Sequence, residues 1–104
     1  CKKVYEDEFA LAFHDINPMA PVHVLVIPKG PYESFADFAR EADAETVAGF
    51  FQAVNTTARE LGLEPQGYRI LANHGQAARQ EVPHFHVHIF GGVDLGPMIT
   101  RVGG

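Results

Sequence analysis

Apolar and polar residues alternate strictly along residues 84–90, which read His-Phe-His-Val-His-Ile-Phe. Successive side chains of a β-strand point to opposite faces of a sheet, so this pattern predicts a strand with one apolar face and one histidine face. We expect the apolar residues to face the core. His84, His86 and His88 then line the other face, at a spacing of roughly 6–7 Å from one side chain to the next.

Hydrophobic patterns elsewhere predict four more strands and two helices. The strands are expected over residues 2–6, 9–14, 22–27 and 67–73, and the nearly all-apolar segment 22–27 is typical of a central strand. A short helix is expected over residues 34–40, with Ser34 as its N-cap. A longer helix is expected over residues 43–61, between Asp43 as N-cap and Gly62 as stop signal. Since strands and helices do not alternate, the fold class is α+β with a mainly antiparallel sheet.

The long helix carries two apolar stripes. The first follows the spacing of a core-facing stripe and comprises Val47, Phe51, Val54, Ala58 and Leu61. The second stripe is predicted to face elsewhere and comprises Phe50, Ala53 and Thr57. A monomer needs one such stripe, so Phe50 suggests a contact between subunits. The alternative is a single wide face toward the core.

Composition limits the class of protein. With 104 residues the chain is predicted to form one domain, residues 1–104, and its 46% apolar content is ordinary for a globular protein. A net charge of −5 argues against nucleic acid as the main partner. No apolar run approaches the roughly 20 residues of a membrane span. Cys1 is the single cysteine, which excludes an internal disulfide and suggests a reducing, cytoplasmic environment. Because the chain starts at Cys1 rather than at methionine, we expect N-terminal residues to be missing.

The histidine row allows two kinds of chemistry. Three imidazoles could hold zinc, but neighbouring side chains on one strand face point in parallel and converge poorly on one ion. The adjacent loop offers amides and Arg79, which suit an anion better than a cation. The other possibility is nucleophilic attack on phosphorus by the middle imidazole, with a covalent phosphohistidine that water hydrolyses. We therefore expect no metal and no other cofactor.

Two segments resemble a known family. Residues 80–90, Gln-Glu-Val-Pro-His-Phe-His-Val-His-Ile-Phe, match the signature of the histidine triad (HIT) family. Residues 13–29, from Phe-His-Asp-Ile-Asn-Pro to Val-Ile-Pro-Lys, resemble the first half of its Hint branch. The resemblance also includes Gly67 and Asn73 in the expected order, and it covers most of the chain.

The resemblance implies a HIT-like fold, with a five-stranded antiparallel sheet and two helices in each subunit of a homodimer. It implies a purine nucleotide, such as an AMP or GMP conjugate, bound over the sheet. The implied activity is metal-free hydrolysis of AMP-amine bonds, that is, of purine nucleoside phosphoramidates. By position, His86 is the nucleophile, His84 and His88 flank it, and His23 is the fourth active-site histidine.

The resemblance also implies nucleotide-binding positions. Asp15 matches the carboxylate that binds the ribose hydroxyls, although the residue alone would be interpreted as a turn cap before Asn17-Pro18. The other implied positions border the nucleoside or lie on the phosphate side: His14, Ile16, Asn73, Gln80, Glu81, Val82 and His88.

One departure from the family bears on the substrate. Animal Hint proteins carry a serine where this chain has Glu81, so its carboxylate either attracts a cationic leaving group or points into solvent. Two other functions are compatible with the same pocket. One is cleavage of dinucleoside polyphosphates, which the Hint-like segment 13–29 disfavours. The other is a nucleotide-sensing dimer with residual hydrolysis. Because a pure binder has no need of His86, the intact residue favours an enzyme.

Overall fold

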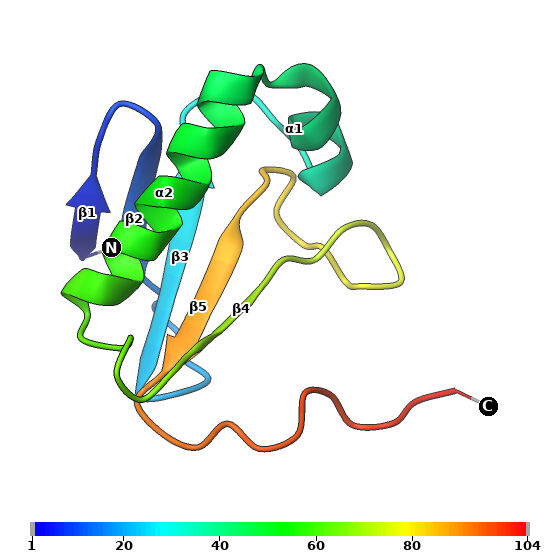
Figure 1. Ribbon diagram of the computed structural model, residues 1–104. Coiled ribbons are helices and arrows are strands. Elements are labelled where there is room, and N and C mark those ends of the chain that lie inside the picture. Colours follow the sequence, from blue (N-terminus) through cyan, green and yellow to red (C-terminus); the bar gives the residue numbers. More distant parts are fainter. Residues whose placement is uncertain (1, 104) are drawn as a thin grey trace.

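A computed structural model describes residues 2–103 of the chain. The strands are β1 (Lys3–Glu6), β2 (Ala10–His14), β3 (Val22–Pro28), β4 (Arg69–Leu71) and β5 (Val87–Gly91). The helices α1 (Phe35–Glu41) and α2 (Ala44–Glu60) connect β3 to β4. The strands form one antiparallel sheet in the order β1-β2-β3-β5-β4, with β3 at its centre (Figure 1). The predicted α+β class, with five antiparallel strands and two helices, is confirmed.

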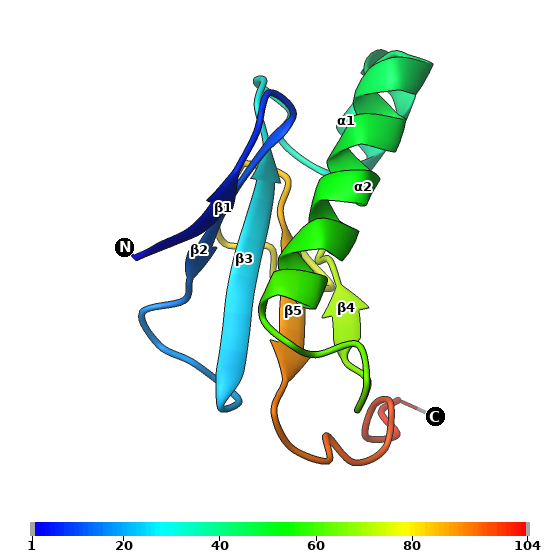
Figure 2. The same cartoon turned by 60° about the vertical axis from the view of Figure 1, so that its left-hand side comes forward.

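Both helices lie on one side of the sheet, and the core fills the space between them and the strands (Figure 2). Aromatic rings form its centre. Phe38 of α1 stacks on Phe85, with ring centroids 5.0 Å apart, and Phe50 of α2 packs against both rings. Burial alternates along residues 84–91, so Phe85, Val87 and Ile89 are buried as predicted. The opposite face of β5 is thereby free to carry histidines.

The long helix confirms its predicted ends and corrects its predicted faces. The Asp43 side chain accepts a hydrogen bond from the backbone N–H of Thr46, and Gly62 adopts φ +74° just beyond the helix. However, Phe50 is fully buried against the sheet, whereas Phe51 is 38% exposed. The prediction of a separate subunit-facing stripe at Phe50 is therefore wrong, and the wide core face is correct.

A close approach explains this orientation of α2. A side chain at Gly49 would meet the ring of Phe9, whose nearest atom lies 2.5 Å from the Cβ position. Because Gly49 has no side chain, α2 can pack directly on the Phe9 ring. This packing places the next residue, Phe50, in the core. The pattern of apolar residues alone does not predict this contact.

The predicted strand over residues 84–90 begins three residues late. In the register of β3 and β5, Val26 lies opposite Val87, so Phe85 would lie opposite Pro28. Proline has no N–H to donate to the ladder. The N–H of Phe85 instead donates to the carbonyl of Tyr32, ahead of α1. His84 and His86 therefore precede β5, although burial still alternates through them.

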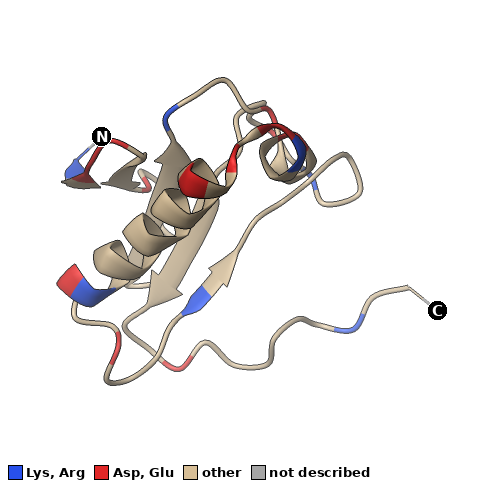
Figure 3. Cartoon of the chain, turned by 45° about the horizontal axis from the view of Figure 1, so that its top comes forward, with Lys and Arg blue, Asp and Glu red and all other residues tan. Residues whose placement is uncertain are grey.

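Charged groups are kept away from the central strands. Figure 3 shows acidic and basic residues at the ends of α2 and on the loops, and none along β3 and β5. Among the described residues, no helix combines the length and the apolar character that crossing a bilayer requires.

Candidate functional site

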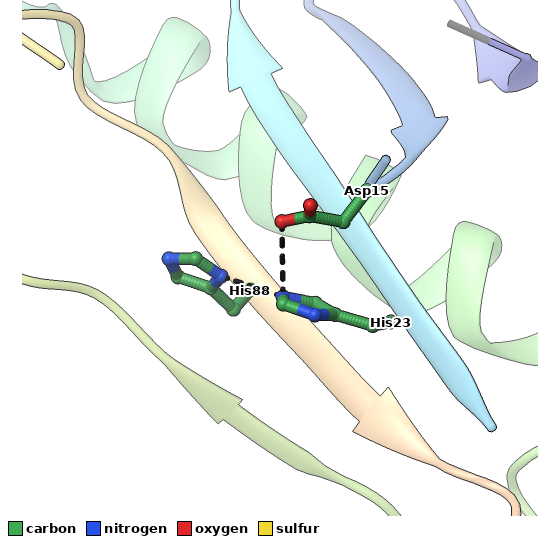
Figure 4. Close-up of side chains that lie close together, drawn as sticks. All are labelled: Asp15, His23 and His88. Atoms are coloured by element: carbon green, nitrogen blue, oxygen red, sulfur yellow. Dashed lines mark hydrogen bonds and ion pairs between the residues drawn. The ribbon is translucent and has the colours of Figure 1, made fainter. Parts of the chain in front are cut away.

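The site lies on the face of the sheet that the helices leave uncovered. Leu25 lies opposite His88 and His23 lies opposite Phe90, so both histidines occupy the face opposite Val24 and Ile89 of the core. Asp15 follows β2, and its backbone N–H donates to the carbonyl of His23. Three strands thus bring Asp15, His23 and His88 together (Figure 4).

Short polar contacts join these three residues. His23 Nε2 lies 2.9 Å from His88 Nδ1 and 3.4 Å from Asp15 Oδ2. The other oxygen of Asp15 accepts a hydrogen bond of 2.8 Å from the N–H of Asn17, so the predicted turn cap is present as well. The turn cap at Asp15 is therefore confirmed, and its other oxygen faces His23, while ribose binding by Asp15 stays a prediction.

Burial keeps these histidines uncharged. The pKa of His88 is lowered to about 4, chiefly by removal of the ring from water and also by repulsion from the His86 and His23 rings, while the Asp15 carboxylate acts in the opposite direction. Burial also lowers the pKa of His23, against the opposing effect of Asp15. His88 is therefore neutral at pH 7 and can offer one N–H and one lone pair.

The ring of His86 is held by the backbone of its own segment. His86 Nδ1 lies 2.7 Å from the carbonyl oxygen of His84. A carbonyl only accepts, so Nδ1 carries the proton and Nε2 keeps its lone pair in the neutral ring. The His86 and His88 rings are neighbours, with centroids 4.9 Å apart. The geometry leaves an unprotonated imidazole nitrogen beside a second neutral imidazole.

His84 contributes its carbonyl, and its ring is not brought into hydrogen-bond contact with the other histidines. Its Nε2 is buried and has no hydrogen-bond partner within residues 2–103.

His14 also lies away from the other histidines. It follows Ala10 and Ala12 in the alternation of β2, which gives it the helix-facing side at the exposed strand end. Ile16 is 76% exposed beside Asp15, at the edge of the site.

The loop before β5 is braced by Gln80. Its amide nitrogen donates to the carbonyls of Glu33 and Val82, at 2.6 Å and 3.2 Å, and its oxygen accepts from the N–H of Gly75. The Gln80 side chain therefore fastens the loop to the entrance of α1 instead of reaching free toward a phosphate. Glu81 and Val82 are exposed, and Asn73 is half-buried.

A pocket of about 370 Å³ lies on this loop, and the sequence alone gave no indication of it. The residues that line it are Glu33, Ser34, His74, Gly75, Gln80, Glu81 and Pro83. A larger pocket of about 600 Å³ lies elsewhere, between the segments 62–69 and 92–96. The smaller pocket is the one that shares its wall with the segment leading to His84 and His86.

Asp15, His23 and His88 are also the residues that could hold a metal, since one donor atom from each lies within 4.8 Å of the others. This set draws on three strands, and the histidine row alone does not reveal it. The N–H of Met19 donates to His23 Nδ1 at 3.0 Å, so the neutral ring carries its proton on Nε2, the nitrogen that faces the set. Metal ligation there would require moving this proton to Nδ1 and breaking the Met19 bond. The chemistry of the donors fits a hydrogen-bonded cluster better than a metal site.

Comparisons with known proteins agree on one family. The HIT domain family model matches residues 1–95. An uncharacterized 13.2 kDa HIT-like protein of Azospirillum brasilense is 58% identical over 101 residues, covering 97% of this chain and 83% of the relative. The purine nucleoside phosphoramidase of Escherichia coli K12 is 35% identical over 100 residues, covering 96% of this chain and 83% of the relative.

Solved structures give the same result. A histidine triad protein from Clostridium difficile superimposes with a TM-score of 0.84 at 41% identity, covering 92% of this chain and 83% of that one. A HIT family hydrolase from Clostridium thermocellum gives a TM-score of 0.84 at 44% identity, covering 95% of this chain and 85% of that one. The chain therefore belongs to the HIT domain family and has the fold of HIT family hydrolases.

Proposed function

We propose that this protein hydrolyses purine nucleoside phosphoramidates, in which the phosphate of AMP or GMP is joined to an amine. The observation that carries the proposal is the hydrogen bond from His86 Nδ1 to the His84 carbonyl. This bond leaves the Nε2 lone pair of His86 available for attack, next to the neutral ring of His88. The phosphoramidase name of the relative from Escherichia coli supports the same reaction class.

The reaction divides into two displacements at phosphorus. His86 Nε2 attacks the phosphorus, the P–N bond breaks, and its electron pair leaves with the amine, which takes up a proton. Water then attacks the nucleotidyl-His86 intermediate and releases the nucleoside monophosphate. Donors around the phosphoryl oxygens stabilise the charge that develops in each step, and the N–H of His88 is one of them.

Nucleotide binding is proposed at the strand ends. Asp15 offers a carboxylate to the ribose diol, and the exposed Ile16 offers apolar contact to the nucleoside. Asn73 and the loop that Gln80 braces lie on the phosphate side in this proposal. His14 and Val82 would complete the rim of the nucleotide site. The net charge of −5 is compatible with this because binding relies on hydrogen bonds and apolar contact.

Turnover of an AMP-amine fluorogenic substrate beside a dinucleoside polyphosphate, each with and without exhaustive EDTA treatment, tests the proposal. We expect turnover of the AMP-amine to exceed that of the polyphosphate, and to survive EDTA, because no step uses a metal. Preference for the polyphosphate would assign the other hydrolase activity. Nucleotide binding without turnover of either substrate would support a sensing role. Stoichiometric zinc with EDTA-sensitive turnover would contradict the metal-free mechanism.

Glu81 is expected to favour cationic leaving groups. It lines the 370 Å³ pocket together with Glu33, so an amine that extends from the phosphate into this pocket meets two carboxylates. Glu81→Gln should lower kcat/KM for a lysine-like AMP-amine about fivefold more than for a neutral amine, since one partly exposed ionic contact supplies about 1 kcal/mol. Equal effects on charged and neutral amines would show that Glu81 points into solvent. Glu33→Gln is the matched comparison at the other carboxylate that lines the pocket.

We also propose that the protein forms a twofold-symmetric homodimer in which α2 packs against its mate. Since Phe50 is committed to the core, the residue of α2 available for this contact is Phe51, whose ring is 38% exposed. A dimer contact through α2 would cover this partly exposed ring. Cytoplasmic localisation remains a prediction from the sequence.

A further inference from the structure

We propose that Gln80 is a positioning residue: its side-chain amide holds the loop of residues 74–83 against the entrance of α1, in the place where this loop faces the phosphate of the substrate. The attachment of the loop stands on the contacts of the structure alone. Its consequence for turnover rests on the proposed function, in which the loop lies on the phosphate side.

The loop has no strand or helix to hold it in place. Residues 74–83 contain neither element. The N–H of Gly75 donates to the side-chain oxygen of Gln80 at 3.0 Å, and the backbone N–H of Gln80 donates to the carbonyl of Gly75 at 3.1 Å. These two bonds close residues 75–80 into a compact turn. A turn of this kind defines its own shape, and its place on the protein depends on an attachment elsewhere.

The Gln80 amide supplies this attachment. Its Nε2 donates to the carbonyl of Glu33 at 2.6 Å and to that of Val82 at 3.2 Å. A carboxamide offers two N–H donors and one acceptor oxygen, and its neighbours here are two carbonyls and one N–H, so the orientation of the amide is fixed. Within residues 2–103, no other hydrogen bond joins residues 74–83 to residues 30–41.

The attachment point belongs to a rigid part of the molecule. The ring of Tyr32 packs edge-on against the buried Phe38, with centroids 5.0 Å apart. The carbonyl of Tyr32 accepts a hydrogen bond of 2.8 Å from the N–H of Phe85, whose ring is also buried. The segment ahead of α1 therefore holds the chain at Gln80 and again at Phe85. Residues 81–84 form a bridge between these two fixed points, and the bridge leads into the histidine segment.

Loss of the Gln80 donor would free one end of this bridge. The Phe85 end stays fixed by its buried ring and its bond to Tyr32, so the core and β5 persist. The exposed residues Glu81 and Val82 would lose their fixed position. Groups that act on a transferring phosphoryl must be held closely, and a displacement of about 1 Å can cost on the order of a hundredfold in rate. We therefore expect the change in kcat rather than in the fold.

Gln80→Glu makes the attachment depend on pH. The introduced carboxyl group faces the carbonyls of Glu33 and Val82, so its ionised form is repelled by both, whereas its protonated form can donate to one of them. These carbonyls raise the pKa of the introduced group. The titratable side chains that line the adjoining pocket are Glu33, His74 and Glu81. The two carboxylates act in the same direction as the carbonyls, and His74 opposes them only when it is protonated.

Steady-state kinetics of the full chain with an AMP-amine tests the positioning role. We expect the kcat of Gln80→Glu, divided by the wild-type kcat at the same pH, to be at least about tenfold lower at pH 8 than at pH 5, with KM changing much less. Gln80→Leu has no donor, so its ratio should stay low at both pH values. Gln76→Glu is the matched control, because it places the same charge at an exposed position of the same loop, and its ratio should not change with pH.

A ratio for Gln80→Glu that is constant with pH, or that follows the ratio of Gln76→Glu, would overturn the positioning role. A wild-type kcat in Gln80→Leu would overturn it as well.

Exchange of the side-chain amide protons, followed by ¹⁵N NMR on the wild type, tests the attachment even if a variant does not fold. We expect the Gln80 amide to exchange at least about tenfold more slowly than the exposed Gln76 amide. Equal rates would overturn the attachment. Slow exchange at Gln80 together with no phosphoramidate turnover in the wild type would refute the proposed function and leave the attachment of the loop intact.

Discussion

Replacing His86 with alanine is expected to reduce phosphoramidate turnover by about three powers of ten or more, because the covalent route loses its nucleophile. His86 Nε2 is the ring nitrogen left unprotonated by the hydrogen bond to the His84 carbonyl. Steady-state kinetics with an AMP-amine substrate measures the loss.

Nucleotide affinity provides the control for this variant. We expect the dissociation constant for AMP to change by less than about tenfold, because the proposed binding relies on Asp15 and on apolar contact to the nucleoside. Calorimetric titration of the alanine variant measures this constant, and its thermal unfolding confirms the fold. Retention of more than a few per cent of activity would exclude His86 as the nucleophile.

Replacing Phe50 with alanine is expected to lower the free energy of unfolding by about 3–5 kcal/mol, the usual loss for a buried phenylalanine. The Phe50 ring is fully buried and contacts the rings of Phe38 and Phe85, at centroid distances of 5.2 Å and 5.6 Å. Truncation would leave a cavity under the segment that carries the histidines. Urea unfolding monitored by circular dichroism measures the change.

Phe51→Ala is the matched control, one residue along the same helix. Its ring is 38% exposed, so the loss should be well below that of Phe50→Ala. Light scattering of the Phe51 variant should show weaker self-association if α2 forms the dimer contact. A larger destabilisation from Phe51 than from Phe50 would contradict the packing of α2, and a monomeric wild type would contradict the dimer.

Local signals made the elements predictable from the sequence. The cap at Asp43 and the stop at Gly62 act within one helical turn, so the bounds of α2 follow from neighbouring residues. The period-two alternation identified the core face of β5. The rotation of α2 was less accessible, because it depends on the contact between Gly49 and Phe9, which are distant in sequence.

The sequence predicted which residues form the site better than it predicted which of them contact one another. The HIT resemblance indicated His23, His86, His88 and Asp15. The hydrogen bond between His23 and His88 joins residues 65 positions apart, and it requires the register of β3 against β5. The resemblance assigned the His84 ring and the Gln80 amide to the site, but His84 contacts His86 through its backbone carbonyl, and the Gln80 side chain holds the loop to the carbonyl of Glu33.

Mass spectrometry of the full chain, quenched in alkali during turnover of an AMP-amine substrate, tests whether His86 is the covalent nucleophile. Phosphohistidine-type bonds are preserved under such conditions, so a nucleotidyl adduct can be assigned to a peptide. We expect an adenylyl group on His86 that forms with release of the amine and disappears as AMP accumulates. Turnover without an adduct at any time point, or an adduct on a different residue, would contradict it.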